Sequence, residues 1–272
     1  MIVALTVLFI IGASFSWGPA FLSFLAIIVV AGAALELGCL FKTEAASWAR
    51  LCSALFIASP AVFHGVFLLA GARPASALAL SLCLFAAGFW LAGRASLQEG
   101  TRFLRDEGVA FLLVGLGGYA LISLINLRAI YMTGYYGMNQ GANYGVLCLA
   151  WLVLVVASND MAAYFGGSFF QGPKLAPALS PNKTISGSIC GLGAALIVGG
   201  VCSFIIHRAV LEGITFGMIS AVGAQLGDLL KSFLKRIYGV KDLGNIFPGH
   251  GGVLDRADGT LGAALLFSLL LG

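Results

Sequence analysis

Residues 232–258 read SFLKRIYGVKDLGNIFPGHGGVLDRAD and lie between two apolar runs, residues 210–230 and 258–271. With Lys231, this short stretch holds five of the 15 basic residues in the chain, together with Asp242, Asp255, Asp258 and a single histidine, His250. The chain as a whole is apolar: 60% of its 272 residues are hydrophobic and only 10% are charged. That is too little charge to cover the surface of a soluble domain. The sequence therefore predicts an all-α integral membrane protein with one charged segment at the membrane edge.

Apolar runs separated by short polar breaks predict a polytopic bundle of eight or nine transmembrane helices. The expected spans are residues 2–16, 18–40, 51–71, 75–93, 108–127, 143–165, 185–206, 210–230 and 258–271. The first and last runs are short for a bilayer, which takes about 20 helical residues to cross. We divide the chain into N-terminal transmembrane helices, residues 1–128, which could shape a lipid groove or make oligomer contacts, and a catalytic region, residues 129–272.

The basic residues are distributed unevenly among the loops that connect nine spans. Loops after the second, fourth, sixth and eighth spans hold 12 of them, whereas loops after the third, fifth and seventh hold three. Because cytoplasmic loops are enriched in Lys and Arg, this bias places residues 232–258 on the cytoplasmic side and the N-terminus inside. Merging the first two spans would move only the N-terminus to the outside. The absence of organelle-targeting features favours a bacterial inner membrane.

Glycines and carboxylates in residues 227–258 indicate a site for a phosphorylated, metal-bound ligand. Residues 248–252, PGHGG, give the backbone the freedom to approach a ligand closely. Asp255 and Asp258 are three residues apart, so a helix would place both carboxylates on one face. A divalent cation would relieve their repulsion, and oxygen ligands suit Mg²⁺. Upstream, Asp228 lies in an apolar run, with Ser232 one turn later on the same face.

A second polar group begins at Asp160, after the apolar run 145–157, and continues to residues 180–184, SPNKT. A carboxylate at that depth needs a cation or a hydrogen-bond donor, and the lysine and hydroxyls of residues 180–184 can hold a phosphate or a polar head group. An ordinary cytoplasmic loop with a helix cap explains these residues equally well. In the first half, we interpret Glu36 as a residue that reaches the interface near Lys42, and His64 as a neutral structural histidine.

The order of these residues resembles that of the phosphatidate cytidylyltransferases, also called CDP-diacylglycerol synthases. The matching signature is Ser232-x-x-Lys235-Arg236, Lys241-Asp242-x-Gly244 and Phe247-Pro248-x-His250-Gly251-Gly252-x-x-Asp255-Arg256-x-Asp258. A second resemblance lies in Asp160-x-x-Ala163-Tyr164 and Ser180-Pro181-x-Lys183-Thr184. Ala257 and Ser186 depart from the family pattern, and many members carry an acid where this chain has Ser186. The resemblance covers residues 159–258, and the N-terminal half resembles the family only in hydropathy.

The resemblance implies transfer of the cytidylyl group of CTP to phosphatidate, with release of pyrophosphate. It implies that Asp228 and Asp255 hold Mg²⁺, with room for a second cation, and that Asp258 and Asp160 are further metal ligands. The expected catalytic residues are Asp228, Asp255, Lys235 and Arg236. The expected substrate-binding residues are Ser180, Lys183, Ser232, Lys241, His250, Gly251, Gly252 and Arg256. The implied partners are CTP, phosphatidate and membrane lipid, with no nucleic acid, and a homodimer is left open.

Four other classes of protein remain open. A CTP-dependent kinase of a polyprenyl or phytyl alcohol would use similar nucleotide chemistry but would transfer the γ-phosphoryl group. A transporter would also carry acids in its spans, although here the polar residues gather on one side of the membrane. A CDP-alcohol phosphotransferase needs more of its motif than Asp258-Gly259. A non-catalytic relative would not need to retain every candidate ligand, whereas this chain retains them all.

Overall fold

The structure, a computed structural model, describes residues 2–41, 47–69, 83, 101–125, 144–205, 208–244 and 251–271. The described elements are helices apart from one small hairpin, in agreement with the predicted all-α class. In chain order they are α1 (Ile2–Phe41), α2 (Ser47–Leu69), η1 (Leu104–Gly108), η2 (Phe111–Leu116), α5 (Gly117–Ile125), α6 (Tyr144–Phe170), β1 (Lys174–Ala176), β2 (Ser180–Thr184), α7 (Ile185–Ile205), α8 (Val210–Tyr238) and α9 (Leu254–Leu271).

Five helices in the described part of the chain are long and apolar enough to cross a membrane. They are Phe21–Phe41, Thr101–Ile125, Leu147–Phe170, Ile185–Phe204 and Val210–Tyr238. A shorter apolar helix, Leu51–Gly65, lies within α2. These helices match predicted spans, and the chain is an integral membrane protein. The span expected at 75–93 lies outside the described residues, apart from residue 83.

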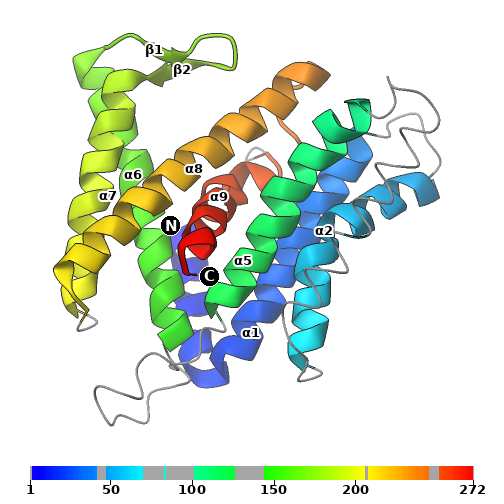
Figure 1. Cartoon of the computed structure of the whole chain (residues 1–272), viewed down its shortest axis with the longest axis horizontal. Helices are drawn as coiled ribbons and strands as arrows, with labels where there is room; N and C mark the ends of the chain where they lie inside the picture. Colours follow the sequence, from blue (N-terminus) through cyan, green and yellow to red (C-terminus); the bar gives the residue numbers. More distant parts are fainter. Residues whose placement is uncertain are drawn as a thin grey trace.

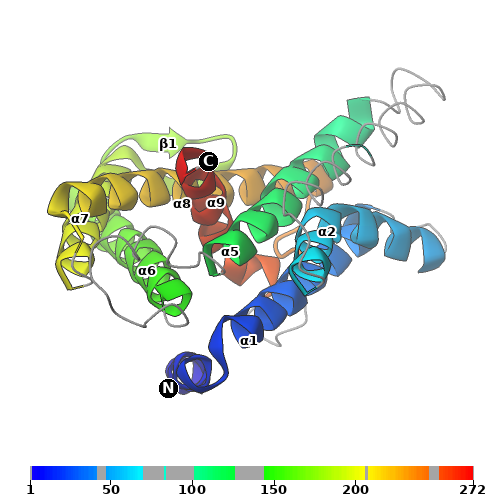
Figure 2. The same cartoon turned by 60° about the horizontal axis from the view of Figure 1, so that its bottom comes forward.

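The two spans expected at 2–16 and 18–40 are parts of one helical element, α1, which is 40 residues long. A straight helix of this length would measure about 60 Å, twice the hydrocarbon thickness of a bilayer. Figures 1 and 2 show instead that the dark-blue N-terminal arm of α1 turns sharply away from the rest of the helix. Residues 18–19, Gly-Pro, weaken a helix at this part of the chain. A bend within one helix therefore replaces the break between two spans, as in the alternative that merges them.

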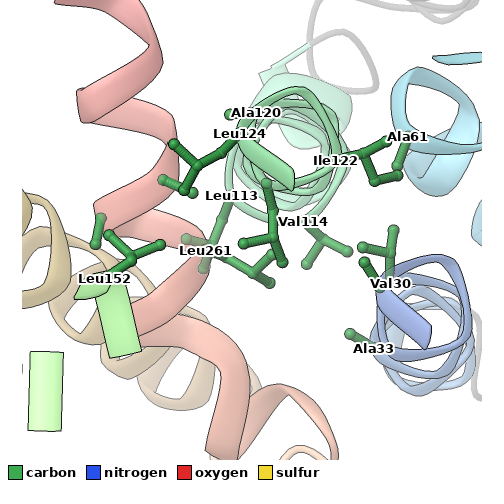
Figure 3. Close-up of a cluster of buried hydrophobic side chains, with 14 of the residues drawn as sticks. Val30, Ala33, Ala61, Leu113, Val114, Ala120, Ile122, Leu124, Leu152 and Leu261 are labelled. Carbon is green, nitrogen blue, oxygen red and sulfur yellow. The ribbon is translucent and has the colours of Figure 1, made fainter. Parts of the chain in front are cut away.

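The core lies around a helix that runs from Thr101 to Ile125 and contains the two π-helical turns η1 and η2 before it becomes α5. Figure 3 shows side chains from this helix meeting those of α1, α2, α6 and α9. The labelled residues are Val30, Ala33, Ala61, Leu113, Val114, Ala120, Ile122, Leu124, Leu152 and Leu261. All of them are buried. The N-terminal helices and α9 thus share one core.

His64 of α2 is buried at this side of the core. Its Nε2 lies 3.0 Å from the hydroxyl of Ser123, and its ring packs on Tyr119. Both neighbours belong to α5. These contacts support the interpretation of His64 as a structural residue.

Helices α6, α7, α8 and α9 pack in chain order, each against the next. Between α6 and α7 the strands β1 and β2 form an antiparallel hairpin, which pairs Lys174 with Thr184 and Ala176 with Ser180. Figure 1 shows this hairpin at the top of the molecule, at the same end as the C-terminal part of α8 and the start of α9. The residues of the two polar groups predicted from the sequence are therefore brought to one end of the fold.

Candidate active site

Helices α8 and α9 approach each other through glycines. A Cβ atom on Gly227 would collide with the backbone oxygen of Asp258, and one on Gly262 would collide with the backbone of α8 at Gly223. Small residues at such positions allow helix backbones in a membrane to come into direct contact. The close contact at Gly227 brings the next residue, Asp228, beside Asp258.

Lys231 joins these two carboxylates. Its Nζ lies 2.9 Å from Asp228 Oδ1 and 2.6 Å from Asp258 Oδ2. The hairpin adds a second cation, because Lys183 Nζ lies 2.5 Å from Asp228 Oδ2. Asp258 is only 6% exposed, so its charge depends on Lys231 for compensation. Lys231 was not among the predicted site residues, although its position in the charged segment, three residues after Asp228, was a usable signal.

Asp160 of α6 reaches the same cluster and is held by a chain of amides. The side-chain NH₂ of Asn159 donates to Asp160 Oδ1 over 3.0 Å, and the NH₂ of Gln225 on α8 donates to Asn159 Oδ1 over 3.0 Å. Gln225 also donates to the backbone oxygen of Ser188 on α7. These bonds link Asp160 of α6 to the two helices α7 and α8. The sequence had given no indication of the part played by Gln225.

Two cavities flank the hairpin. The larger has a volume of about 690 Å³, and its polar lining includes Asp160, Gln171, Lys174, Lys183, Gln225 and Asp228. The smaller has a volume of about 430 Å³ and is lined by Ser180, Asn182, Ser232, Lys235, Arg236 and Lys241, among others. Asn182 lines both, so the two cavities are neighbours. The hairpin is attached to α8 here, because Arg236 Nε donates to the backbone oxygen of Leu179 over 3.0 Å.

Asp255, in the first turn of α9, forms an ion pair with a different lysine, Lys235. Lys235 Nζ lies 2.5 Å from Asp255 Oδ1, while Asp255 Oδ2 accepts the backbone N–H groups of Leu243 and Gly252 over 3.3 and 3.1 Å. Burial alone would raise the pKa of Asp255, but the contact with Lys235, the Gly252 N–H and the lysine charges outweigh it. The pKa of this carboxyl is therefore lowered, and the group stays ionised.

Most of the predicted site residues fall into two groups, and four others are named singly. One cluster contains Asp160, Lys183, Asp228 and Asp258, and the structure adds Lys231 to it. The residues around the smaller cavity are Ser180, Ser232, Lys235, Arg236 and Lys241, and Lys235 links them to Asp255. Arg256 is exposed, Gly251 has a positive φ of 80°, Gly252 is buried, and His250 lies outside the described residues.

The prediction that Asp228 and Asp255 hold Mg²⁺ stays a prediction. In the structure Asp228 lies against Lys183 and Lys231, and Asp255 lies against Lys235. Lys231 also contacts Asp258, so Asp228 and Asp258 share one lysine. Among the described residues no group of three or more His, Cys, Asp and Glu side chains is arranged to hold a metal ion. Two carboxylates do fit Mg²⁺, which is commonly held by one or two carboxylates together with substrate phosphates. The donor chemistry of Asp228 and Asp258 is therefore suitable for a metal that arrives with a phosphorylated substrate.

The sequence of this chain is similar to the sequences of known cytidylyltransferases. A sequence model of the cytidylyltransferase family matches residues 1–272. The chain is 37% identical to the phosphatidate cytidylyltransferase of Brucella suis over 187 residues, which make up 68% of this chain and 65% of that protein. It is 37% identical to the enzyme of that name from Helicobacter pylori over 59% of this chain and 54% of that protein. For the Bacillus subtilis enzyme the identity is 38%, over 52% of this chain and 54% of that protein.

These matches leave a third or more of each relative's length uncovered, whereas the family match extends over the whole of this chain. The chain belongs to the cytidylyltransferase family.

Proposed function

We propose that the protein transfers the cytidylyl group of CTP to phosphatidate and so makes CDP-diacylglycerol for phospholipid synthesis. An oxygen of the lipid phosphate attacks the α-phosphorus of CTP, the bond from this phosphorus to the bridging oxygen breaks, and pyrophosphate leaves. Both reactants are anions, so the protein has to compensate charge on the approaching phosphates and on the leaving group. The observation that carries the proposal is the convergence of Lys183, Lys231 and Lys235 with four aspartates beside two cavities.

The smaller cavity suits the triphosphate of the nucleotide. Three basic side chains line it, from Lys235, Arg236 and Lys241, together with the hydroxyls of Ser180 and Ser232. Charge-assisted hydrogen bonds of this kind are among the stronger ones that a protein offers to a phosphate. We assign Gly251, Gly252 and His250 to the same nucleotide, on the basis of the family signature.

The larger cavity suits the phosphate of the lipid. One wall of this cavity is formed by α6. On the same helix the large hydrophobic side chains of Met161, Tyr164 and Phe165 are exposed. A lipid could reach Lys183 along this surface while its chains stay in the membrane. Mg²⁺ held by Asp228 and Asp258, with Asp160 and Asp255 close by, would neutralise charge on the reacting phosphates. A second cation stays part of the proposal, since the family resemblance implies room for one.

We further propose that this end of the molecule faces the cytoplasm in a bacterial inner membrane. The distribution of basic residues among the loops supports this orientation, and CTP is a cytoplasmic metabolite. In this arrangement the helices of residues 1–128 support the catalytic region of residues 129–272, with which they share one core.

The position of a radioactive label tests the reaction. With CTP labelled at the α-phosphorus, the purified protein should place the label in a lipid product that depends on phosphatidate. With CTP labelled at the γ-phosphorus, the label should appear in pyrophosphate. Transfer of the γ-label to a polyprenyl or phytyl alcohol, with release of CDP, would replace the proposal with a lipid kinase.

A further inference from the structure

Glu36 of α1 makes two hydrogen bonds to the start of α9, more than 200 residues later in the chain. Its Oε1 accepts the backbone N–H of Val253 over 2.7 Å, and its Oε2 accepts the N–H of Leu254 over 3.1 Å. The residue is only 6% exposed. The sequence-based interpretation of Glu36 as a side chain that reaches the interface is therefore wrong. Its carboxylate is buried because it has specific partners within the protein.

The first N–H groups of a helix have no partner inside the helix. A carboxylate at this place satisfies them and interacts favourably with the helix dipole. Leu254 is the first residue of α9, so Glu36 supplies this function from a distant helix. Without an acceptor, the partly buried N–H of Val253 and the buried N–H of Leu254 would remain unsatisfied, which is costly away from water.

The loop that leads into α9 is shaped around the same carboxylate. Gly244 and Gly252 both lie against Glu36, and a Cβ atom on either glycine would collide with its carboxylate oxygens. Asp255 then accepts the N–H groups of Leu243 and Gly252. Two carboxylates, one from α1 and one from α9, thus hold both described ends of the loop.

We infer that Glu36 is a positioning residue for the catalytic aspartates of α9, an inference that rests on the proposed function. Asp255 follows Leu254 directly, and Asp258 lies one turn further along the helix. Their contacts with Lys235 and Lys231 are 2.5 and 2.6 Å long, so a small shift of the start of α9 would disturb both. Glu36 thereby connects the N-terminal helices to the chemistry of the site without touching the substrates.

The test compares Glu36→Gln with Leu37→Ala in the full-length protein. Glutamine has the same shape, but its NH₂ group would face a backbone N–H, so one bond is lost and the charge is removed. Leu37 is the next residue of α1 and is fully buried, so its truncation weakens packing while leaving the Glu36 carboxylate in place. Four quantities are measured: the melting temperature, hydrogen exchange of residues 252–255, kcat with CTP and phosphatidate, and the Mg²⁺ concentration that gives half-maximal activity.

We expect Glu36→Gln to remain folded, to exchange the amides of Val253 and Leu254 faster, to lower kcat by about tenfold or more, and to require more Mg²⁺. Leu37→Ala should lower the melting temperature without raising the Mg²⁺ requirement. Three outcomes for Glu36→Gln would each overturn the inference. The first is unchanged hydrogen exchange, and the second is faster exchange with unchanged kcat and Mg²⁺ requirement. The third is a general loss of fold like that of Leu37→Ala. Inactive wild-type protein with faster local exchange in Glu36→Gln would instead refute the proposed function and leave the Glu36 contact in place.

Discussion

Lys231 Nζ lies 2.6 Å from Asp258 Oδ2, across the glycine-rich contact between α8 and α9. The same ammonium group lies 2.9 Å from Asp228, which belongs to its own helix. The lysine therefore holds two carboxylates together at the place where the helices are closest. We expect this arrangement to matter both for the stability of the protein and for its response to metal ions.

Replacement of Lys231 by methionine should destabilise the protein strongly. The change removes one partner of a buried ion pair and leaves Asp258 buried without a cation, at a cost of about 3 kcal/mol or more, while Asp228 keeps its contact with Lys183. Mg²⁺ should then raise the melting temperature of Lys231→Met more than that of the wild type, because it can take the place of the missing charge. Equal effects of Mg²⁺ on the two proteins would argue against a metal site between these carboxylates.

Replacement of Gly227 by alanine should separate α8 from α9. The new methyl group would strike the backbone oxygen of Asp258, which cannot move aside without a shift of the helix. Both the melting temperature and the rate of cytidylyl transfer should fall. Gly193→Ala in α7 is the matched control, because a Cβ atom there meets nothing within 4 Å. Since alanine favours a helix over glycine by about 1 kcal/mol, this control should be neutral or slightly stabilising.

Replacement of Asp255 by asparagine should leave the protein folded and remove most of its activity. Asparagine keeps one acceptor oxygen for the N–H groups of Leu243 and Gly252 but loses the charge opposite Lys235. A loss of at least about 100-fold in kcat is expected if this charge acts on the reacting groups. Assays of the purified variant in detergent would check it, and near-normal turnover would exclude Asp255 from the catalytic residues.

The difference in stability between the wild type and Asp255→Asn should depend on pH. Because the pKa of Asp255 is lower in the folded protein than its usual value, the ionised carboxylate stabilises the fold at pH values above the unfolded-state pKa of about 3.9. This contribution is lost as the pH falls through the folded-state pKa. The difference in melting temperature between wild type and Asp255→Asn should therefore be constant near neutral pH and shrink below about pH 4. A difference that persists unchanged in acid would mean that Asp255 stabilises the fold by packing alone.

Much of the fold followed from local patterns in the sequence. The apolar runs at 143–165, 185–206 and 210–230 became α6, α7 and α8, because a segment in lipid has to satisfy its own backbone and does so as a helix. Asp255 and Asp258 do lie on one helix, α9, although the predicted span began only at residue 258. Both results depend on neighbours along the chain, which the sequence displays directly.

The contacts between distant segments could not be predicted in this way. Glu36 and Leu254 are 218 residues apart, and Gln225 meets Asn159 across 66 residues. The pairing of carboxylates with lysines depends on the distance between α8 and α9. Gly227 and Gly262 together determine this distance. The hairpin that carries Lys183 is a further example, since its short strands have no clear alternating pattern in the sequence.

Release of pyrophosphate by the purified full-length protein in detergent micelles is the most direct test of the proposed activity. CTP, phosphatidate and Mg²⁺ would be supplied together and then omitted one at a time. The proposed function predicts release only when all three are present, with a CDP-linked lipid formed in equal amount. Folded protein that releases no pyrophosphate under these conditions, or that consumes CTP only with a polyprenyl or phytyl alcohol, would contradict it.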